Sequence, residues 1–203
     1  MRRMTILMLL VACSVAFGAQ PAAAQKRSAP IAILLPGSGG VHPGDFLIRN
    51  KASIERAGIE TVVTTSPSGA VAAANAAQQS GRRAILVGMS LGTTHVASAL
   101  TSGAKVAGVV FVSGIYDDVM AILGSPAVLP RTLVVHHRAD ACHRTLPEAA
   151  ERFVRWARGK ASIRWITTSG ESVGRECGAR AAHGFFRKDG PAVSAIIGFV
   201  RSR

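Results

Sequence analysis

The pentapeptide G-x-S-x-G at residues 88–92 centres on Ser90 and directly follows the apolar run of residues 84–87. This pattern at the end of a strand is typical of a nucleophile elbow, a sharp strand-to-helix turn that exposes a serine hydroxyl above a sheet. Glycines suit both flanks of such a turn, because the strand and the helix approach too closely for larger side chains. Residues 93–100 are compatible with a helix, so the context on both sides of the pentapeptide supports the elbow.

Apolar and β-branched runs alternate with helix-compatible segments along the rest of the chain. Continuous apolar runs are typical of strands buried on both faces of a parallel sheet. We expect strands at residues 31–35, 60–65, 83–88, 106–112, 132–136 and 162–167, and helices at residues 45–57, 70–80, 91–101, 119–123, 146–158 and 190–200. This alternation predicts an α/β protein with a doubly wound, mainly parallel sheet of about six strands. The segment between the fourth and fifth strands is too short for a cap domain.

The N-terminal segment has the pattern of a secretory signal peptide. Arg2 and Arg3 precede an apolar run, and an A-x-A site ends at Ala24. We expect a leader over residues 1–24, one domain over residues 25–203, and a periplasmic or secreted protein. Lipoprotein processing at Cys13 is the second-ranked interpretation.

The chain is basic, with a net charge of +13, or +11 without the two leader arginines. Such a charge attracts nucleic acid, anionic lipid and acidic polymers without specificity. The basic residues are scattered, however, and only 5% of residues are aromatic. We therefore expect no specific nucleic-acid partner and no stable membrane span after leader cleavage. A role in surface binding would require the basic side chains to cluster in space.

Chemistry-bearing residues follow several expected strands. In open parallel sheets, sites lie at the carboxyl ends of the strands. Residues 36–40 are Gly-rich and follow the first strand, Ser90 follows the third, Asp140 the fifth and His183 the sixth. Serine, aspartate and histidine therefore occur in the chain order found in one large class of hydrolases.

These motifs resemble those of the α/β-hydrolase family over nearly all the chain after the leader. The resemblance is narrower to small exported bacterial members that pair an H-H-x-x-D-x-C loop with a cysteine shortly before a final H-G-F. Here these are residues 136–142, Cys177 and residues 183–185. The chain departs from the pattern at Pro36, where many members have histidine, so any stabilisation of that loop by histidine must come from elsewhere.

The resemblance implies a role for each candidate residue. Ser90 would be the nucleophile, His183 the general base and Asp140 the group that orients the imidazole. The backbone N–H groups of Leu91 and Ser38 would form the oxyanion hole, with Gly39 as the alternative donor. Gly39, His42 and Tyr116 are candidates to line the substrate pocket.

Other acids and histidines compete for these roles. Asp117 and Asp118 follow the fourth strand, where some α/β-hydrolases place the acid, but the loop after the fifth strand is the commoner position. His136 and His137 end a strand, and we expect one of them to be a neutral core residue. His143 is expected to be exposed, and His95 to be structural.

Of the three cysteines, Cys142 and Cys177 remain after the leader. An exported chain with two cysteines favours a disulfide. It would tie the loop that contains Asp140 (the aspartate loop) to the loop that contains His183 (the histidine loop). Two free thiols are the alternative. A zinc site would need more ligands at suitable spacing, and we expect no metal and no organic cofactor.

The expected function is hydrolysis of a small ester or related acyl compound through an acyl-enzyme. A peptidase, a thioesterase or an acyltransferase could use the same triad, and a non-catalytic binding protein could share the fold. The sequence does not indicate the oligomeric state.

Overall fold

The computed structural model describes residues 29–168 and 172–202. The expected leader over residues 1–24 and the lipidation candidate Cys13 lie outside the described residues. Six strands form one all-parallel sheet in the order β2-β1-β3-β4-β5-β6, which confirms the predicted fold class. The strands are β1 (Ile31–Leu35), β2 (Glu60–Val63), β3 (Ala84–Met89), β4 (Gly108–Val112), β5 (Thr132–His137) and β6 (Ala161–Ile166).

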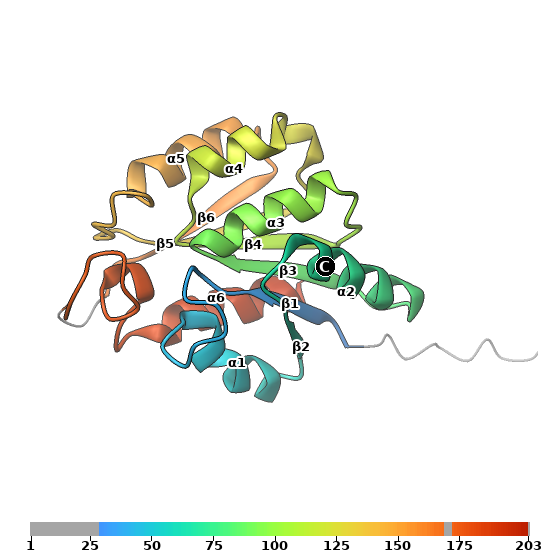
Figure 1. Cartoon of the computed structure of the whole chain (residues 1–203), viewed down its shortest axis with the longest axis horizontal. Coiled ribbons are helices and arrows are strands. Elements are labelled where there is room, and N and C mark those ends of the chain that lie inside the picture. The colour runs from blue at the N-terminus through green and yellow to red at the C-terminus, as the bar shows by residue number, and fades with distance from the viewer. Residues whose placement is uncertain (1–28, 169–171, 203) are drawn as a thin grey trace, which may run out of the picture.

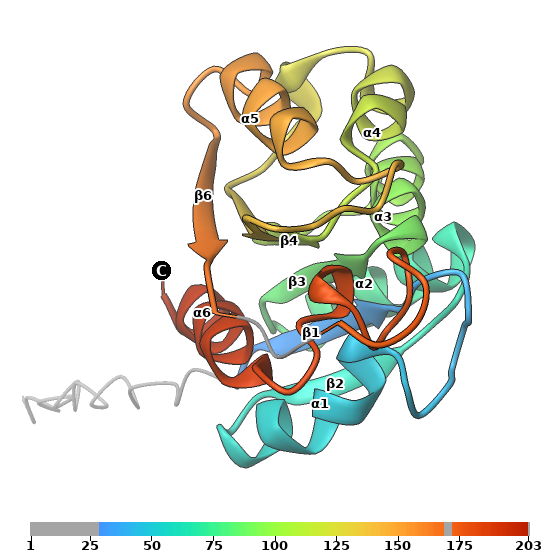
Figure 2. The same cartoon turned by 90° about the vertical axis from the view of Figure 1, so that its left-hand side faces the viewer.

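Helices cover both faces of the sheet (Figures 1 and 2). One face packs against α1 (Phe46–Arg56) and α6 (Asp189–Arg201), and the other against α2 (Pro67–Gln79), α3 (Leu91–Thr101), α4 (Tyr116–Leu123) and α5 (Pro147–Trp156). Between β4 and β5 the chain forms only α4 and the short 3₁₀ helix η1 (Pro126–Val128). Within the described ranges, no helix combines the length and apolar character needed to cross a bilayer.

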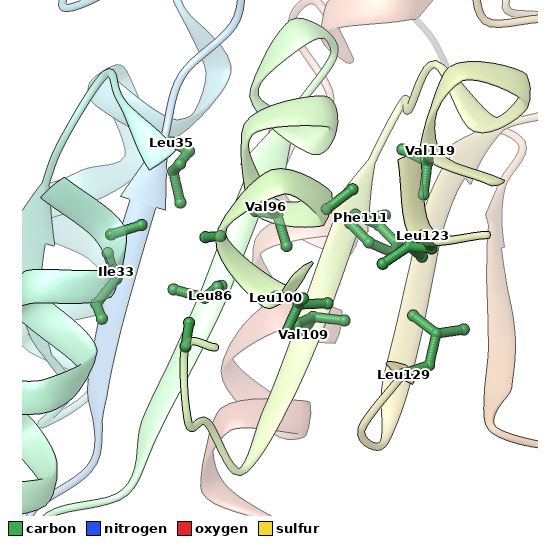
Figure 3. Close-up of a cluster of buried hydrophobic side chains, with 14 of the residues drawn as sticks. Ile33, Leu35, Leu86, Val96, Leu100, Val109, Phe111, Val119, Leu123 and Leu129 are labelled. Carbon is green, nitrogen blue, oxygen red and sulfur yellow. The ribbon is translucent and has the colours of Figure 1, made fainter. Parts of the chain in front are cut away.

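Alternation along the strands divides the core into two layers. In β1, Ile33 and Leu35 pack toward α2 and α3, whereas Ala32 and Leu34 pack toward α1 and α6. Figure 3 shows the first layer, where side chains of β1, β3 and β4 meet those of α3 and α4. Both faces of each central strand are buried, which explains why these strands are continuously apolar in the sequence.

Two helices begin three residues earlier in the chain than the sequence pattern suggested. Helix α2 starts at Pro67, because Ser66 Oγ accepts the Gly69 N–H and proline suits the first helical position. Helix α4 starts at Tyr116, not residue 119, and two acidic residues occupy its first turn, where the helix dipole favours them. The earlier start of α4 places Tyr116 in the core.

The turn from β3 into α3 lies against the end of β1. A Cβ atom on Gly92 would lie 2.0 Å from the Leu35 carbonyl oxygen, and one on Gly88 would lie 2.6 Å from the Gly92 oxygen. Neither position has room for a methyl group, because the obstructing atoms belong to the backbone. These two glycines therefore allow α3 to pack close to both β3 and β1.

Replacing Gly92 with alanine tests this close approach. The added methyl group must displace the carbonyl end of β1, and we expect Gly92→Ala to lower the free energy of unfolding by about 3 kcal/mol. Urea denaturation followed by circular dichroism measures the change.

The matched control is Gly198→Ala in α6, where an added Cβ meets nothing within 4 Å. Alanine should stabilise that helix by about 0.5–1 kcal/mol relative to glycine. Equal effects of the two substitutions would contradict the steric account.

Candidate functional site

Ser90 occupies the turn between β3 and α3 in a strained backbone conformation. Its φ is 49° and its ψ is −116°, a region that L-residues rarely adopt and that persists only when the surroundings enforce it. The Ser90 N–H donates to the Val112 carbonyl at 2.9 Å, and the Thr93 hydroxyl donates to the Ser90 carbonyl at 2.6 Å. Ser90 Oγ has no hydrogen-bond partner among the described residues, so its hydroxyl is not engaged.

The loop after β1 lies beside Ser90 and is held by Asp45. A Cβ on Gly37 would lie 3.5 Å from the Ser90 Cβ. Asp45 Oδ2 accepts the Gly37 N–H at 2.9 Å, while Oδ1 caps α1 by accepting the N–H groups of Leu47 and Ile48. One carboxylate therefore fixes this loop against the start of α1, and it supplies the stabilisation that Pro36 cannot.

The N–H groups of Ser38 and Leu91 are both free to receive a ligand. Leu91 is the first residue of α3, where backbone N–H groups have no partner within the helix. Neither N–H donates to an acceptor in the part of the chain that the structure describes. Ser38 and Gly39 line the same cavity as Ser90, as does His42, whose Nδ1 accepts the Gly44 N–H at 3.0 Å.

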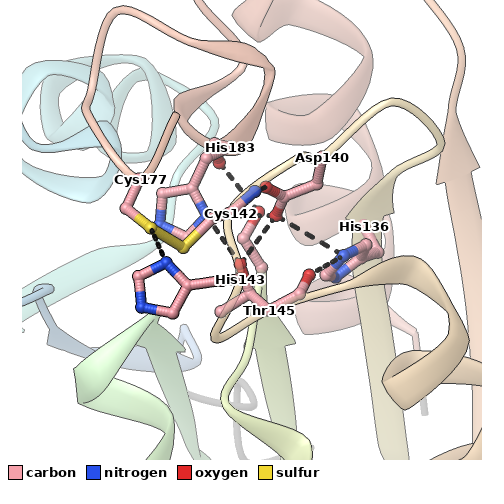
Figure 4. Close-up of a disulfide and its surroundings, with 8 residues drawn as sticks. His136, Asp140, Cys142, His143, Thr145, Cys177 and His183 are labelled. Atoms are coloured by element: carbon pink, nitrogen blue, oxygen red, sulfur yellow. Dashed lines mark hydrogen bonds and ion pairs between the residues drawn. A yellow bond between two sulfur atoms is a disulfide. The ribbon is translucent and has the colours of Figure 1, made fainter. Parts of the chain in front are cut away.

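His183 lies in the 3₁₀ helix η2 (Ala182–Gly184) and contacts Asp140 (Figure 4). Its Nδ1 lies 3.0 Å from Asp140 Oδ2 and 3.0 Å from Thr145 Oγ1. The Thr145 hydroxyl donates its hydrogen to Asp140 Oδ2 at 2.9 Å. Because both neighbours of Nδ1 then act as acceptors, Nδ1 carries the proton. The other ring nitrogen, Nε2, is left as an acceptor and has no partner among the described residues.

The structure distinguishes between the competing acids. Asp140 is 2% exposed, and its Oδ1 accepts the Cys142 N–H at 3.0 Å. Asp117 and Asp118 are exposed at the start of α4, where they pair with Arg152 and Arg144 at 2.8 Å and 2.9 Å. Of the three candidates, only Asp140 contacts His183.

His136 is a neutral core residue beside this pair. Its Nε2–H donates to the Thr145 carbonyl at 2.8 Å, and its Nδ1 faces the Tyr116 hydroxyl at 3.4 Å. Burial lowers the pKa of His136 from its ordinary 6.5 to about 4, against the opposing effect of Asp140. His137 is also buried, whereas His143 is exposed.

Tyr116 was expected to line the pocket, but it does not. The side chain is fully buried and packs on Phe153 with ring centroids 5.2 Å apart. Burial raises the pKa of its hydroxyl far above the ordinary value. Tyr116 thus packs beside His136 in the core and does not line the cavity.

Long-range hydrogen bonds hold the histidine loop in place. The buried Ser113 hydroxyl donates to the His183 carbonyl at 2.8 Å. Arg49 of α1 donates to the carbonyls of Gly184 and Gly44 and pairs with Asp189 at 2.7 Å. Because Arg49 bonds to both Gly44 and Gly184, it ties the loop after β1 to the histidine loop.

A disulfide between Cys142 and Cys177 joins the aspartate loop to the histidine loop (Figure 4). Ligand atoms of these two cysteines and of His143 lie within 4.8 Å of one another. The cysteines are oxidised, however, and a disulfide offers no thiolate to a metal ion. The arrangement is therefore a covalent brace.

Ser90 and His183 line one cavity of about 610 Å³. Its walls come from the loop after β1, from the elbow, and from the loop that carries His183. No hydrogen bond joins Ser90 Oγ to His183 in the described structure, a common situation in sites without a bound substrate.

The buried His136 predicts a pH dependence of stability. The unfolded chain takes up a proton near pH 6.5, whereas the folded chain does so only near pH 4, so stability falls as the pH drops through this interval. Between about pH 7 and about pH 5 this one residue should cost about 2 kcal/mol. Urea unfolding at both pH values measures the loss.

The control is His136→Gln, whose amide can still donate to the Thr145 carbonyl. The variant should lose about 2 kcal/mol less than the wild type over the same interval. Identical losses in the two proteins would show that His136 is not the group responsible.

Comparison with known proteins gives structural matches only. No protein-family model and no curated protein sequence matches the chain. The structure is similar to an esterase from Exiguobacterium antarcticum (TM-score 0.60, 10% identity, 87% of this chain and 93% of the other). It is also similar to the esterase domain of a Rhodothermus marinus protein (0.61, 12%, 88% and 88%) and to a monoacylglycerol lipase from Paleococcus ferrophilus (0.56, 12%, 86% and 96%). The chain thus has the α/β-hydrolase fold.

Proposed function

We propose that this chain is an exported serine hydrolase that cleaves a carboxylic ester through Ser90, His183 and Asp140. One observation carries the proposal. The serine on the strained elbow and a histidine already bonded to a buried aspartate line the same cavity. The similarity to two esterases and a lipase supports an ester as the substrate.

Acylation begins when His183 Nε2 removes the proton from Ser90 Oγ, which attacks the ester carbonyl carbon. The resulting imidazolium is stabilised by the Asp140 carboxylate. When the tetrahedral intermediate collapses, the bond to the alcohol oxygen breaks and His183 gives its proton to that oxygen. Water then repeats the sequence on the acyl-enzyme, with His183 again as the base, and releases the acid.

Negative charge develops on the carbonyl oxygen in both steps. The unengaged N–H groups of Leu91 and Ser38 are the proposed donors to this oxyanion. Asp45 contributes indirectly as a positioning residue, because it fixes Gly37 and therefore the path of the chain to Ser38. Loss of one such donor typically costs about 3 kcal/mol of barrier.

Export is supported by the leader pattern of residues 1–24 and by the disulfide. Disulfides persist in oxidising compartments such as the periplasm. We therefore propose a periplasmic or secreted enzyme.

A fluorophosphonate probe tests the proposed nucleophile. The mature protein should be labelled on one serine, and Ser90→Ala should abolish labelling while retaining the wild-type circular dichroism spectrum. A panel of 4-nitrophenyl esters of increasing acyl length then measures kcat/KM. Turnover should fall by at least about 10³-fold in Ser90→Ala and in His183→Ala.

Ser98→Ala, on the same helix as the elbow, is the matched control and should label normally. If folded wild-type protein were not labelled, or if labelling persisted in Ser90→Ala, the proposed nucleophile would be wrong.

The disulfide predicts a joint loss of stability and activity in Cys142→Ala/Cys177→Ala. The cysteines are separated by 35 positions, and releasing a loop of that length should lower the free energy of unfolding by about 4 kcal/mol. Activity should fall under conditions where the variant is fully folded, because Asp140 and His183 lose their shared brace. Unfolding curves and kcat on one ester measure the two effects.

Thiol titration of unreduced mature wild-type protein is the companion measurement and should detect no free thiol. Two reactive thiols per chain would refute the brace.

A further inference from the structure

One wall of the cavity is a turn that carries unpaired positive charge. Residues 173–175 and 177–180 line the cavity together with Ser90. This turn precedes His183 in the chain and lies beside the loop after β1 (Figure 2). Two of its lining residues, Arg175 and Arg180, are exposed arginines.

The turn is held at three points, although its side chains are exposed. The Val173 N–H donates to the Arg180 carbonyl at 2.9 Å, and the Gly178 N–H donates to the Arg175 carbonyl at 2.8 Å. Between these bonds, Cys177 is joined covalently to Cys142 of the aspartate loop. The two arginines therefore project from a braced turn that has a fixed relation to Asp140.

Neither guanidinium group forms an ion pair or a hydrogen bond with the described residues. The guanidinium carbon of Arg180 lies 5.8 Å from the centroid of the Phe186 ring. Three other exposed arginines, Arg138, Arg144 and Arg152, each pair with a carboxylate. Among the described residues, no carboxylate pairs with either arginine of the cavity wall.

The acidic groups near this wall do not neutralise it. Asp45 is the one carboxylate among the described lining residues, and its oxygens accept three backbone N–H groups. Glu176 lies in the turn, but it does not line the cavity. An anionic group that entered the cavity would therefore meet two free guanidinium groups.

Guanidinium groups bind carboxylate and phosphate oxygens through paired, charge-assisted hydrogen bonds. A substrate that fills the cavity displaces water, which strengthens such bonds. We propose, on the basis of the proposed function, that the substrate is an anionic ester whose carboxylate or phosphate is bound by Arg175 and Arg180 while its ester carbonyl lies at Ser90. The two arginines then determine specificity and do not take part in the chemistry.

The test compares charged esters with neutral isosteres. The wild type is assayed with 4-nitrophenyl hydrogen adipate and its methyl ester, which place the charge on the acyl side. It is also assayed with 4-acetoxybenzoate and its methyl ester, which place the charge on the alcohol side. A third pair, 4-acetoxyphenyl phosphate and 4-acetoxyanisole, separates phosphate from carboxylate. At least one anionic ester should exceed its neutral partner in kcat/KM by at least about tenfold.

Arg175→Gln/Arg180→Gln should remove this preference, mainly by raising KM for the anionic ester, so that the ratio of kcat/KM between the charged and the neutral ester falls to about one. Arg164→Gln is the control, because it removes the same charge from the exposed part of β6 outside the cavity. Equal kcat/KM for every charged and neutral pair, in a wild type that the probe labels, would overturn this inference and leave the hydrolase proposal intact.

Binding without turnover separates the two proposals. Ser90→Ala protein is titrated with monomethyl adipate and with phenyl phosphate while amide resonances are followed by NMR. Shifts at residues 173–180 that disappear when Arg175→Gln/Arg180→Gln is added to Ser90→Ala support the anion site, even if the fluorophosphonate probe does not label the wild type. No shifts with either anion would count against it.

Discussion

The site depends on the close packing of α3 against the ends of β1 and β3. The Leu35 carbonyl leaves no room for a side chain at position 92, and the backbone of Gly92 leaves none at position 88. This packing forces Ser90 into its strained conformation and puts the first turn of α3 next to the loop after β1. The serine hydroxyl and two unengaged backbone N–H groups are consequently brought to one edge of the sheet. Backbone geometry therefore accounts for half of the proposed catalytic apparatus.

The other half depends on contacts between distant parts of the chain. Asp140 and Thr145 hold the imidazole of His183, and Ser113 holds its backbone. Arg49 connects the histidine loop to the loop after β1, while the disulfide connects it to the aspartate loop. A single turn, residues 173–180, is thereby placed across from Ser90. Its rigidity is what would let two exposed arginines act as a selective anion site, since preorganised groups lose less entropy on binding.

Local signals in the sequence predicted the strands, the elbow and the three residues of the proposed triad. Apolar runs and glycines are properties of short segments, and the order of residues along the chain is given by the sequence itself. Both can therefore be interpreted without coordinates. Asp45 and Thr145 were missed because their importance comes from partners in another loop: Gly37 for one, His183 for the other. Asp45 was expected as the first residue of a helix, whereas it caps α1, and nothing local indicated that its second oxygen would bind Gly37. Tyr116 was misplaced because the start of α4, which turns it inward, was expected three residues later.

The central claim is that Ser90, two backbone N–H groups and His183 surround one reacting carbon. A crystal structure of the protein inactivated by a small alkyl fluorophosphonate tests this most directly, because the adduct mimics the tetrahedral intermediate. The account predicts phosphorus bonded to Ser90 Oγ, with the phosphonyl oxygen accepting hydrogen bonds from the N–H groups of Leu91 and Ser38, and with His183 Nε2 beside Oγ. An adduct on another residue, or a phosphonyl oxygen directed away from both N–H groups, would contradict it.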